Sequence, residues 1–600
     1  MTKNFHYKNL LGSLSGHWLL LPSIVYLSIF FLLPVCILLS LSFIDGNKNL
    51  SLLNYTRIIS TPVYVKVLLI TLKTAAWTTI FCVCCGYPIA YLLATINKST
   101  KNTLIILVLM PFWTSFLVRA FAWIVLLGTK GAINQWLLAL GLVEVPVKMI
   151  FNFAGVLVGM VHALMPLCIL TMYSVMENID PNLVKAAATL GGRGGPSFWR
   201  IYFPLSFPGV AAGGLMVFIT SLGFFVTPAL LGGSRDTMIA QLIIFQIQEV
   251  LDWGFAGAVG VLLLITVLVI FFLYDRSVGI SSLSGQNSLH SRGKSKWNNP
   301  IYILFNFLGK LFILALSIIC DKCGNFWDIL VRKSANKPPK TISRHLLWIV
   351  ALSFIMFLAL PALFIVPISF TSEGFLSWPP KGFSIKWYKE VLASPVWSMA
   401  VLRSFLVASS SAFIGMCLGV PAAFVLGRRH FLGKGAVFAF LISPIIIPHI
   451  FIAVSLFYLF SKINLVGTSF ALVIGHSVLT IPYVIITVLA VIKNYDRRLD
   501  LAAWTLGAHR LQAFWHVTLP IIRAGLFSAF MFAFIISFDE LTISLFLTGG
   551  ELTTLPKQMW DDAILSVSPV LAAIATLLLA FMSCLILISE IIRRRMEKRK

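Results

Sequence analysis

The chain has 600 residues, of which 59% are hydrophobic and only 11% are charged. Soluble domains carry about 25% charged residues, so this composition excludes a soluble globular protein and predicts an integral membrane protein built from spanning helices. The formal net charge is +25, which we attribute to Lys and Arg in loops on one side of a membrane rather than to nucleic-acid binding.

Apolar runs long enough to cross about 30 Å of hydrocarbon recur along both halves of the sequence. In chain order they cover 18–43, 67–96, 104–128, 150–176, 205–231, 255–275, 345–370, 399–427, 435–461, 467–492, 520–547 and 569–592. The first run is too long for the core of a signal peptide and lacks a small-residue cleavage site, so we interpret it as a span. The predicted fold class is all-α integral membrane, with about 12 transmembrane helices.

The two halves repeat one another. Residues 180–204 read DPNLVKAAATLGGRGGPSFWRIYFP, and residues 496–520 read DRRLDLAAWTLGAHRLQAFWHVTLP, at an offset of 316. Earlier in each half the offset is 333: Tyr55 matches Tyr388, Pro88 matches Pro421 and Pro111 matches Pro444. The difference places 17 extra residues in the first half, most naturally in the loop around 129–149. Two parallel six-helix repeats are therefore expected.

Positive charge gathers in alternate loops and at the C-terminus. The residues are Lys98, Lys101, Lys185, Arg193, Arg200, Arg428, Arg429, Lys434, Lys493, Arg497, Arg498, Arg510 and the tail 593–600. The positive-inside rule puts these loops and both termini in the cytoplasm.

The join between the halves, 276–343, opens with a polar stretch typical of a flexible linker. Its apolar segment, near 301–332, carries a polar stripe at helical spacing, which favours a helix lying in the membrane interface. A thirteenth span is the alternative, but one extra crossing would put the basic loops of the second half outside. We therefore expect repeats at 1–275 and 344–600, joined by a cytoplasmic linker at 276–343.

The paired loops, 180–204 and 496–520, each predict a helix, a glycine turn and a second helix. Asp180 and Asp496 are suited to cap the first helix. Gly191 and Gly507 can end it in the left-handed conformation. Two copies of one polar loop in a membrane chain indicate docking to the same kind of partner.

The paired loops resemble the "EAA" coupling loop of permeases in binding-protein-dependent ABC importers, with the pattern EAA-x3-G-x9-I-x-LP. Matching residues are Ala186, Ala187, Gly191, Ile201 and Pro204 in the first loop, and Ala502, Ala503, Gly507, Val517, Leu519 and Pro520 in the second. The acidic position is Lys185 in one copy and Leu501 in the other, and Phe203 replaces Leu. The resemblance implies that each loop seats a helix in a cleft of an ATPase subunit, and the missing acid puts the usual polar contact in doubt.

The resemblance covers nearly the whole chain. Segments 117–134 and 221–233 look like the first permease of spermidine/putrescine importers, and segments 537–550 and 554–560 look like the second. This implies a bacterial inner-membrane permease with a periplasmic solute-binding protein and two ATPase subunits that carry ATP-Mg. A polyamine-like organic cation is the favoured solute. Sister branches that carry ferric iron, aminoethylphosphonate or opines have similar loops and remain alternatives.

Ionisable and aromatic residues inside spans are candidates for the solute pathway. These are Arg119, Trp123, Asp539 and Glu540. The two carboxylates could attract a cation, form an internal ion pair or cap an unwound segment. Arg119 could pair with Asp539, and His449 is expected to be a packed histidine.

No catalytic or metal-binding constellation is evident. The chain has no GxxxxGK[ST], no HExxH and no Ser-His-Asp grouping, so we expect no enzyme activity and no cofactor. Cys320 and Cys323 form one CxxC without a second pair, which is insufficient for a zinc site. An ion-gradient-driven secondary transporter remains the alternative from a different class. A membrane enzyme acting on lipids would need clustered His, Asp or Glu at a membrane face, and the sequence shows none.

Overall fold

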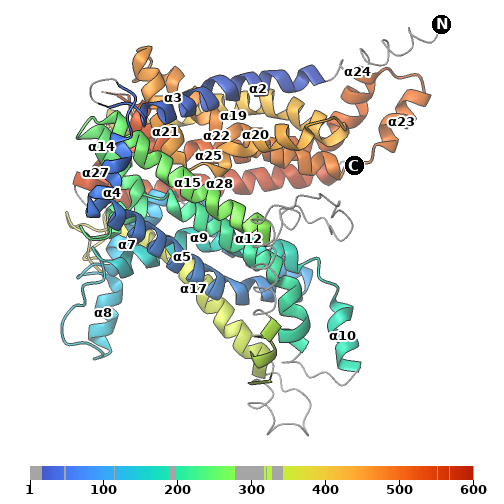
Figure 1. Ribbon diagram of the computed structural model, residues 1–600. Helices are drawn as coiled ribbons and strands as arrows, with labels where there is room; N and C mark the ends of the chain where they lie inside the picture. Colours follow the sequence, from blue (N-terminus) through green and yellow to red (C-terminus); the bar gives the residue numbers. More distant parts are fainter. Residues whose placement is uncertain are drawn as a thin grey trace.

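The computed structural model describes residues 17–45, 49–113, 115–189, 197–277, 317–318, 320–323, 325–326, 342–549, 552–565 and 568–598. These residues form one bundle of long helices (Figure 1). Ten of the described helices are long and apolar enough to cross a membrane, or eleven if one bent pair counts as a span. The predicted all-α membrane fold is therefore confirmed, while the expected interfacial helix near 301–332 falls mostly outside the described residues.

The first half opens with a span that combines three helical pieces and a π-helical turn. The elements of the first half are η1 (His17–Leu20), α2 (Leu21–Leu27), η2 (Ser28–Leu32), α3 (Leu33–Leu41), α4 (Leu53–Ser60), α5 (Pro62–Thr95), α6 (Lys98–Leu109), η3 (Met110–Trp113), α7 (Phe116–Leu127), α8 (Ala132–Ala139), α9 (Phe153–Met176), α10 (Pro181–Thr189), η4 (Phe198–Tyr202), α12 (Phe203–Leu222), α13 (Val226–Leu231), α14 (Ile239–Gln248) and α15 (Trp253–Ser277). The first four of these form the first span.

The second half follows the same order. Its elements are α17 (Ile342–Ser369), α18 (Lys386–Ala393), α19 (Pro395–Arg428), α20 (Lys434–Ile446), α21 (His449–Lys462), α22 (Ser469–Lys493), α23 (Arg498–Thr505), α24 (Arg510–Ala513), η7 (Phe514–Thr518), α25 (Leu519–Phe538), α26 (Thr542–Leu547), α27 (Leu555–Leu565) and α28 (Pro569–Lys598).

Hydrogen bonds made at equivalent places confirm that the halves are structural repeats. The Ile239 N–H donates to Thr71 Oγ1 (2.9 Å), and the Leu555 N–H donates to Ser404 Oγ (2.7 Å). The Phe151 N–H donates to Leu231 O (2.8 Å), and the Gly467 N–H donates to Leu547 O (2.9 Å). Thr71 corresponds to Ser404 by the offset of 333, and Ile239, Phe151 and Leu231 correspond to Leu555, Gly467 and Leu547 by the offset of 316. The two halves therefore fold alike.

The extra residues of the first half lie where the changed offset predicts them. They form α8 and the loop after it, which project from one end of the bundle (Figure 1). Trp136 packs against Phe364 of α17 with ring centroids 5.4 Å apart. The Trp378 N–H donates to Lys130 O across 3.3 Å. The insertion therefore adds contacts between the halves.

Four predicted spans are wrong as continuous helices. In segment 104–128, α6 ends before Pro111 and α7 begins at Phe116, and in segment 435–461, α20 and α21 meet at 94°. Segments 205–231 and 520–547 likewise divide after Leu222 and Phe538. Proline removes a hydrogen-bond donor and clashes with the preceding turn, which explains the first two breaks. We call the four interruptions the central breaks.

The first helix of each half packs against the other half. The span formed by α2, η2 and α3 contacts α19, α21 and α22, whereas α17 contacts α5, α6 and α7. Ser23 Oγ donates to Leu418 O (2.7 Å), and Tyr26 OH donates to Ile474 O (3.2 Å). His162 Nε2 lies 3.1 Å from Leu358 O, one turn before Pro361 inside α17. We call this arrangement the exchanged first helices.

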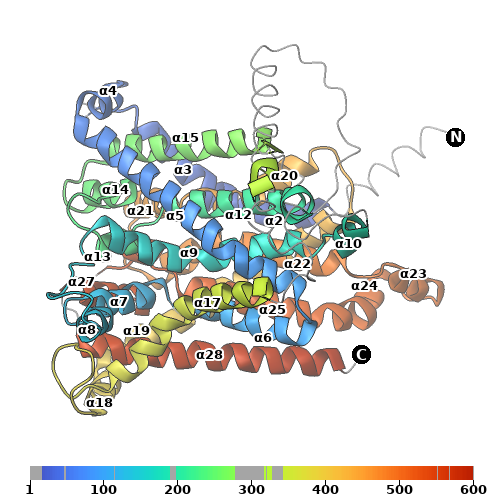
Figure 2. The same ribbon diagram turned by 90° about the horizontal axis from the view of Figure 1, so that it is seen from below.

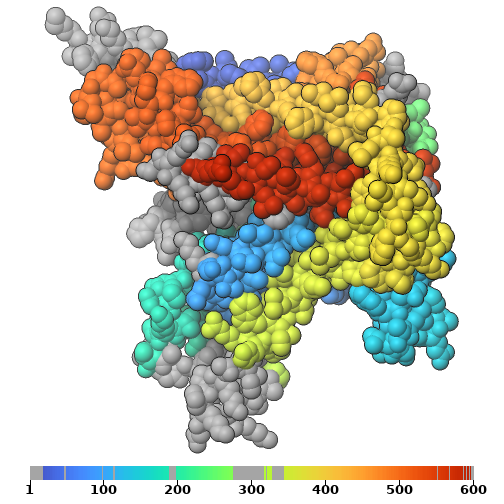
Figure 3. All heavy atoms as spheres, turned by 180° about the vertical axis from the view of Figure 1, so that it is seen from behind, coloured from blue at the N-terminus to red at the C-terminus, as the bar shows by residue number. Residues whose placement is uncertain are grey.

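Both paired loops lie at the same end of the bundle. In Figures 1 and 2, α10 lies at the end that also carries α23 and α24, whereas α4, α8, α14, α18 and α27 lie at the opposite end. Seen from behind, the two loops are separated across that end, on different halves (Figure 3). We call it the loop end.

Candidate functional site

The central breaks of the two halves meet inside the bundle. The Phe116 N–H, at the start of α7, donates to Asp539 Oδ2 across 3.4 Å. At the equivalent place, a Cβ on Gly223 would lie 2.8 Å from Pro448 Cβ. The helices α12 and α25 therefore each end against the proline break of the other half.

Glu540 is the buried carboxylate at this junction. Its side chain is 7% exposed and its Oε2 lies 3.5 Å from His449 Nδ1. The Ile543 N–H donates to Oε1 across 3.1 Å, so the carboxylate also caps α26. Glu540 therefore both contacts a histidine and caps a helix at an unwound segment. His449, with 35% of its side chain exposed, is a partner of Glu540 rather than a residue packed in the core.

His476 of α22 lies beside Glu540 and was not singled out in the sequence. Its Nδ1 is 2.9 Å from Ser537 Oγ, and its Nε2 is 3.2 Å from Ser544 Oγ. These contacts join the end of α25 to α26 across the break. The sequence feature that could have pointed to it is a histidine inside the apolar run 467–492.

Arg119 does not bind Asp539 directly. It is 3% exposed, and its guanidinium donates to the carbonyl oxygens of Ser115 (3.4 Å) and Ala163 (3.3 Å). The guanidinium carbon also lies 4.2 Å from the Phe116 ring centroid. Asp539 binds the backbone of that same residue, while its Oδ1 is buried and accepts no hydrogen bond from the described part of the chain.

Trp123 lies in the contact between the halves. Its ring centroid is 5.6 Å from that of His162 and 5.3 Å from that of Phe357 in α17. Its indole nitrogen is buried, and no hydrogen bond to it is formed within the described residues. The structure therefore places Trp123 among the contacts that hold α17.

The two halves are chemically different at the junction. Phe116 and Phe224 form a ring pair in the first half, with centroids 5.3 Å apart. His449 and Glu540 occupy the equivalent positions in the second half. One half therefore contributes aromatic faces and the other contributes carboxylates, an arrangement that can bind an organic cation.

The second paired loop has the helix–turn–helix form expected from the sequence. Asp496 Oδ1 accepts from the Arg498 N–H (2.9 Å) at the start of α23, and Gly507 ends that helix region at a φ of 87°. On α23, Ala502 is exposed and Ala503 is half-buried. Val517 lies in η7, and Leu519 and Pro520 open α25.

The first paired loop is described in part. Asp180 Oδ1 accepts from the Asn182 N–H (2.9 Å) at the start of α10. Ala186 and Ala187 lie on α10, Ile201 lies in η4, and Pro204 lies in α12. Gly191 lies outside the described residues.

A buried network joins the second loop to its spans. Asp500 Oδ2 is 2.9 Å from an Arg428 nitrogen at the end of α19. Asp500 Oδ1 accepts from Tyr495 OH and Thr518 Oγ1, each at 2.7 Å. Burial raises the pKa of the Tyr495 hydroxyl above its usual value. Asp500 directly precedes Leu501, which stands at the acidic position of the EAA pattern. Its contacts thus fix the start of α23 to the ends of the neighbouring spans.

The first loop uses other contacts at its base. Thr95 and Val184 stand where the second half has its ion pair. Phe198 packs edge-to-face on Tyr91, with centroids 5.3 Å apart, as Phe514 does on Phe424 in the second half (5.7 Å). Arg200 donates to Asp321 (3.1 Å) and Asn325 (2.8 Å) in the join between the halves. These two contacts tie the linker to the first loop.

The sequence matches the family model "Binding-protein-dependent transport system inner membrane component" twice, over residues 86–282 and 415–600. The chain belongs to this family. It is therefore a multi-pass transport permease with two copies of the family domain, not an enzyme. Among the described residues, no group of three His, Cys, Asp or Glu side chains could hold a metal ion.

Curated relatives of the permease each match about the length of one half. The spermidine/putrescine permease PotB of Escherichia coli is 33% identical over 258 residues, covering 42% of this chain and 94% of PotB. PotC of Haemophilus influenzae is 29% identical and covers 40% of this chain and 93% of PotC. The putrescine permease PotI of E. coli is 32% identical and covers 41% of this chain and 89% of PotI. These matches are consistent with two permeases fused in one chain.

Among solved structures, a bacterial alginate ABC transporter in complex with an alginate-bound periplasmic protein is similar to part of the permease. The identity is 17% and the TM-score is 0.39, over 46% of this chain and 98% of that chain.

The Asp500 network of the permease gives a stability prediction. Asp500→Asn is expected to lower the free energy of unfolding by about 1–3 kcal/mol, because Arg428 then remains partly buried without its counter-charge. The double change Arg428→Thr with Asp500→Val copies the equivalent residues of the first half, Thr95 and Val184. It should cost less than Asp500→Asn. Thermal unfolding in detergent measures both, and a larger loss in the double variant would contradict the ion-pair argument.

Proposed function

We propose that the two halves of this permease together form the import pathway for a polyamine-like organic cation. The carboxylate pair at the central breaks carries the proposal. Glu540 is held by His449, and Asp539 keeps a buried oxygen without a hydrogen-bond partner in the described structure. Negative groups of this kind are costly inside a membrane protein and mark solute pathways.

The aromatic side of the junction fits the same class of solute. Phe116 and Phe224 offer ring faces to an ammonium group or to the methylene chain between two ammonium groups. Arg119 is engaged by two backbone carbonyls, and its guanidinium lies over the Phe116 ring, so Phe224 is the ring of this pair that would receive the ammonium group. The spermidine/putrescine and putrescine relatives support this choice of cation.

The paired loops are the proposed docking sites for two ATPase subunits, which would carry ATP-Mg. Both loops lie at one end of the bundle and present exposed faces of α10 and α23 there (Figure 1). The contacts would be made by the EAA-like positions on each loop. A periplasmic solute-binding protein would deliver the cation at the opposite end.

The orientation follows from charge. The loop end carries the basic loops, including Lys185, Arg428 and Lys493, so it would face the cytoplasm of a bacterial cell with both termini. The proposed domains are the repeats 1–275 and 344–600 and a cytoplasmic linker at 276–343. ATP-driven closure of the ATPase pair would draw the two loops together and change which end of the central junction is open.

The test is reconstitution of the full chain in liposomes with its ATPase subunits and binding protein. We expect ATP-dependent uptake of labelled spermidine or putrescine, and no uptake without ATP. Uptake by the chain alone under an ion gradient, unaffected by ATPase, would instead support a secondary transporter. ATP-dependent uptake of an anionic solute but of no amine would retain the importer and reject the cation.

A further inference from the structure

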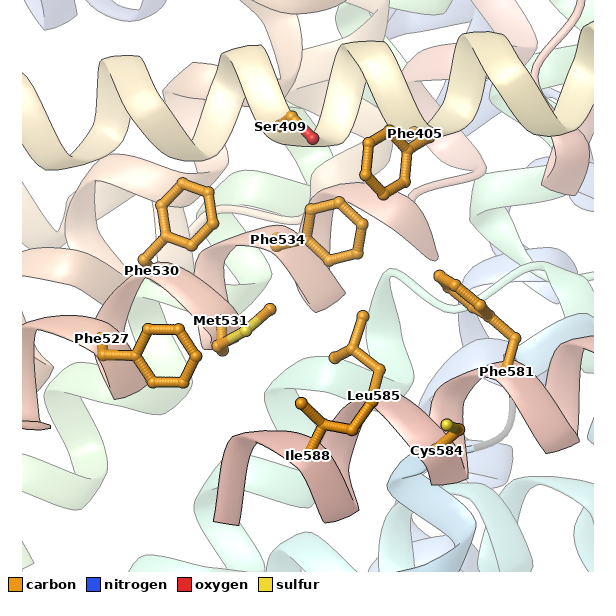
Figure 4. A pocket seen from close by; sticks show the side chains of 10 residues that line it. All are labelled: Phe405, Ser409, Phe527, Phe530, Met531, Phe534, Phe581, Cys584, Leu585 and Ile588. Atoms are coloured by element: carbon orange, nitrogen blue, oxygen red, sulfur yellow. The ribbon is translucent and has the colours of Figure 1, made fainter. Parts of the chain in front are cut away.

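An apolar groove lies on the side of the second half, between α19, α25 and α28 (Figure 4). Its volume is about 320 Å³. Phe405, Ser409, Phe527, Phe530, Met531, Phe534, Phe581, Cys584, Leu585 and Ile588 line it. Phe405 is 47% exposed and Ile588 is 50% exposed. The groove therefore opens to the outside of the bundle, along helices that include the candidate membrane spans Pro395–Arg428 and Arg510–Phe538.

Two arginines lie above this groove on the helices that form it. Arg523 precedes Phe527 by one turn of α25, and Arg595 follows Ile588 by two turns of α28. Both are exposed and both lie toward the loop end. The helical period therefore places each arginine on the face of its helix that lines the groove.

The two arginines also lie at the same height. The antiparallel helices α25 and α28 are registered by Phe538 and Phe581, whose ring centroids are 5.7 Å apart. From that level Arg523 is about 22 Å away and Arg595 about 21 Å away, at 1.5 Å per residue. The groove begins at Phe581 of the ring pair and extends toward the arginines as far as Phe527, about 16 Å at 1.5 Å per residue, which is close to the 15 Å or so of one leaflet.

We propose that the groove binds one acyl chain of an anionic phospholipid, with the phosphate held between Arg523 and Arg595. The apolar lining suits a hydrocarbon chain, and the two guanidinium groups suit a phosphate. The leaflet would be the cytoplasmic one, which rests on the orientation proposed above. Binding itself does not depend on the solute or on the ATPase.

The first half supplies an internal comparison. Gly214 of α12 stands where Phe530 stands, and Phe207 stands where Arg523 stands. A Cβ on Gly214 would lie 3.5 Å from Thr79 Cγ2 of α5, so these two helices approach closely. The equivalent face therefore lacks the α25 arginine, and we expect no matching lipid site there.

The test is native mass spectrometry of the full chain, titrated in detergent with dioleoyl phosphatidylglycerol or dioleoyl phosphatidylcholine. We expect one molecule of phosphatidylglycerol to bind with a dissociation constant at least about 10-fold lower than that of phosphatidylcholine. Arg523→Gln with Arg595→Gln should remove that preference. Ser409→Trp, which fills the groove, should weaken both lipids. Arg344→Gln with Lys322→Gln removes the same charge from exposed positions outside the groove, since Lys322 follows Asp321, which pairs with Arg200 of the first half, and should change neither.

Several results would overturn the proposal. One is equal binding of the two lipids by the native chain. Another is retention of the preference in the Arg523/Arg595 variant when its thermal unfolding is unchanged. Displacement of the lipid by inorganic phosphate alone would show a headgroup site without the groove. Dimers of the chain in place of a bound lipid would show that a second copy covers the surface.

Discussion

Replacing Asp539 and Glu540 together by Asn and Gln is expected to reduce uptake of a cationic solute by about 100-fold or more. A hydrogen bond to a charged group contributes about 1.5–3 kcal/mol, which corresponds to 10-fold or more for each carboxylate. The loss should be larger for Glu540, because it is buried and paired with His449. Initial uptake rates in proteoliposomes, measured against solute concentration, give the effect.

The acid pair Asp561 and Asp562 on α27 provides a matched control. Replacing both by Asn removes two adjacent carboxylates from α27, at the end of the bundle opposite the paired loops (Figure 1). Neutralising it should leave uptake within a few-fold of the native rate. ATPase association should persist in both variants. Native uptake by the Asp539/Glu540 variant would remove these residues from the solute pathway.

Replacing Gly507 and Gly191 together by Trp is expected to abolish association with the ATPase subunits. A Cβ on Gly507 would meet nothing within 4 Å, so the indole would project from the loop without a clash inside the chain. It would stand in the space that a docked partner needs. Co-purification of the ATPase with the tagged permease measures the loss.

Gly433 supplies a control for backbone strain. It has a φ of 82°, close to the 87° of Gly507, and a Cβ there also meets nothing within 4 Å. It lies between α19 and α20, outside both paired loops. Gly433→Trp should cost a similar 1–3 kcal/mol or so of strain and keep the ATPase. Full association of the Gly191/Gly507 variant would contradict docking at the loops.

The sequence predicted those features that depend on local pattern or on repetition. Long apolar runs identified the spans, and the change of offset located the insertion that became α8. The glycine turn at Gly507 and the side-chain contact of Asp496 follow from the preferences of those residue types. Each of these features is decided within a few neighbouring residues.

Features that depend on distant residues could not be predicted in this way. Each central break lies inside one apolar run, and the run alone predicts a single span. It does not show, for example, that α20 and α21 will meet at 94°. The pairing of His449 with Glu540 joins residues 91 positions apart, which no spacing rule covers. Asp500 carries no sequence signal of its own, because its partners Arg428, Tyr495 and Thr518 come together only in the folded chain.

The exchanged first helices have a consequence for biogenesis. Ser23 and Tyr26 donate to the carbonyl oxygens of Leu418 and Ile474, so this span is synthesised before partners that lie some 400 residues later in the chain. Until then the face of this span that packs on α19, α21 and α22 meets lipid or the insertion machinery, while α3 can already pack on α15 of its own half. Joining the halves in one polypeptide keeps that late partner tethered at high local concentration, so assembly does not depend on a chance encounter between separate chains.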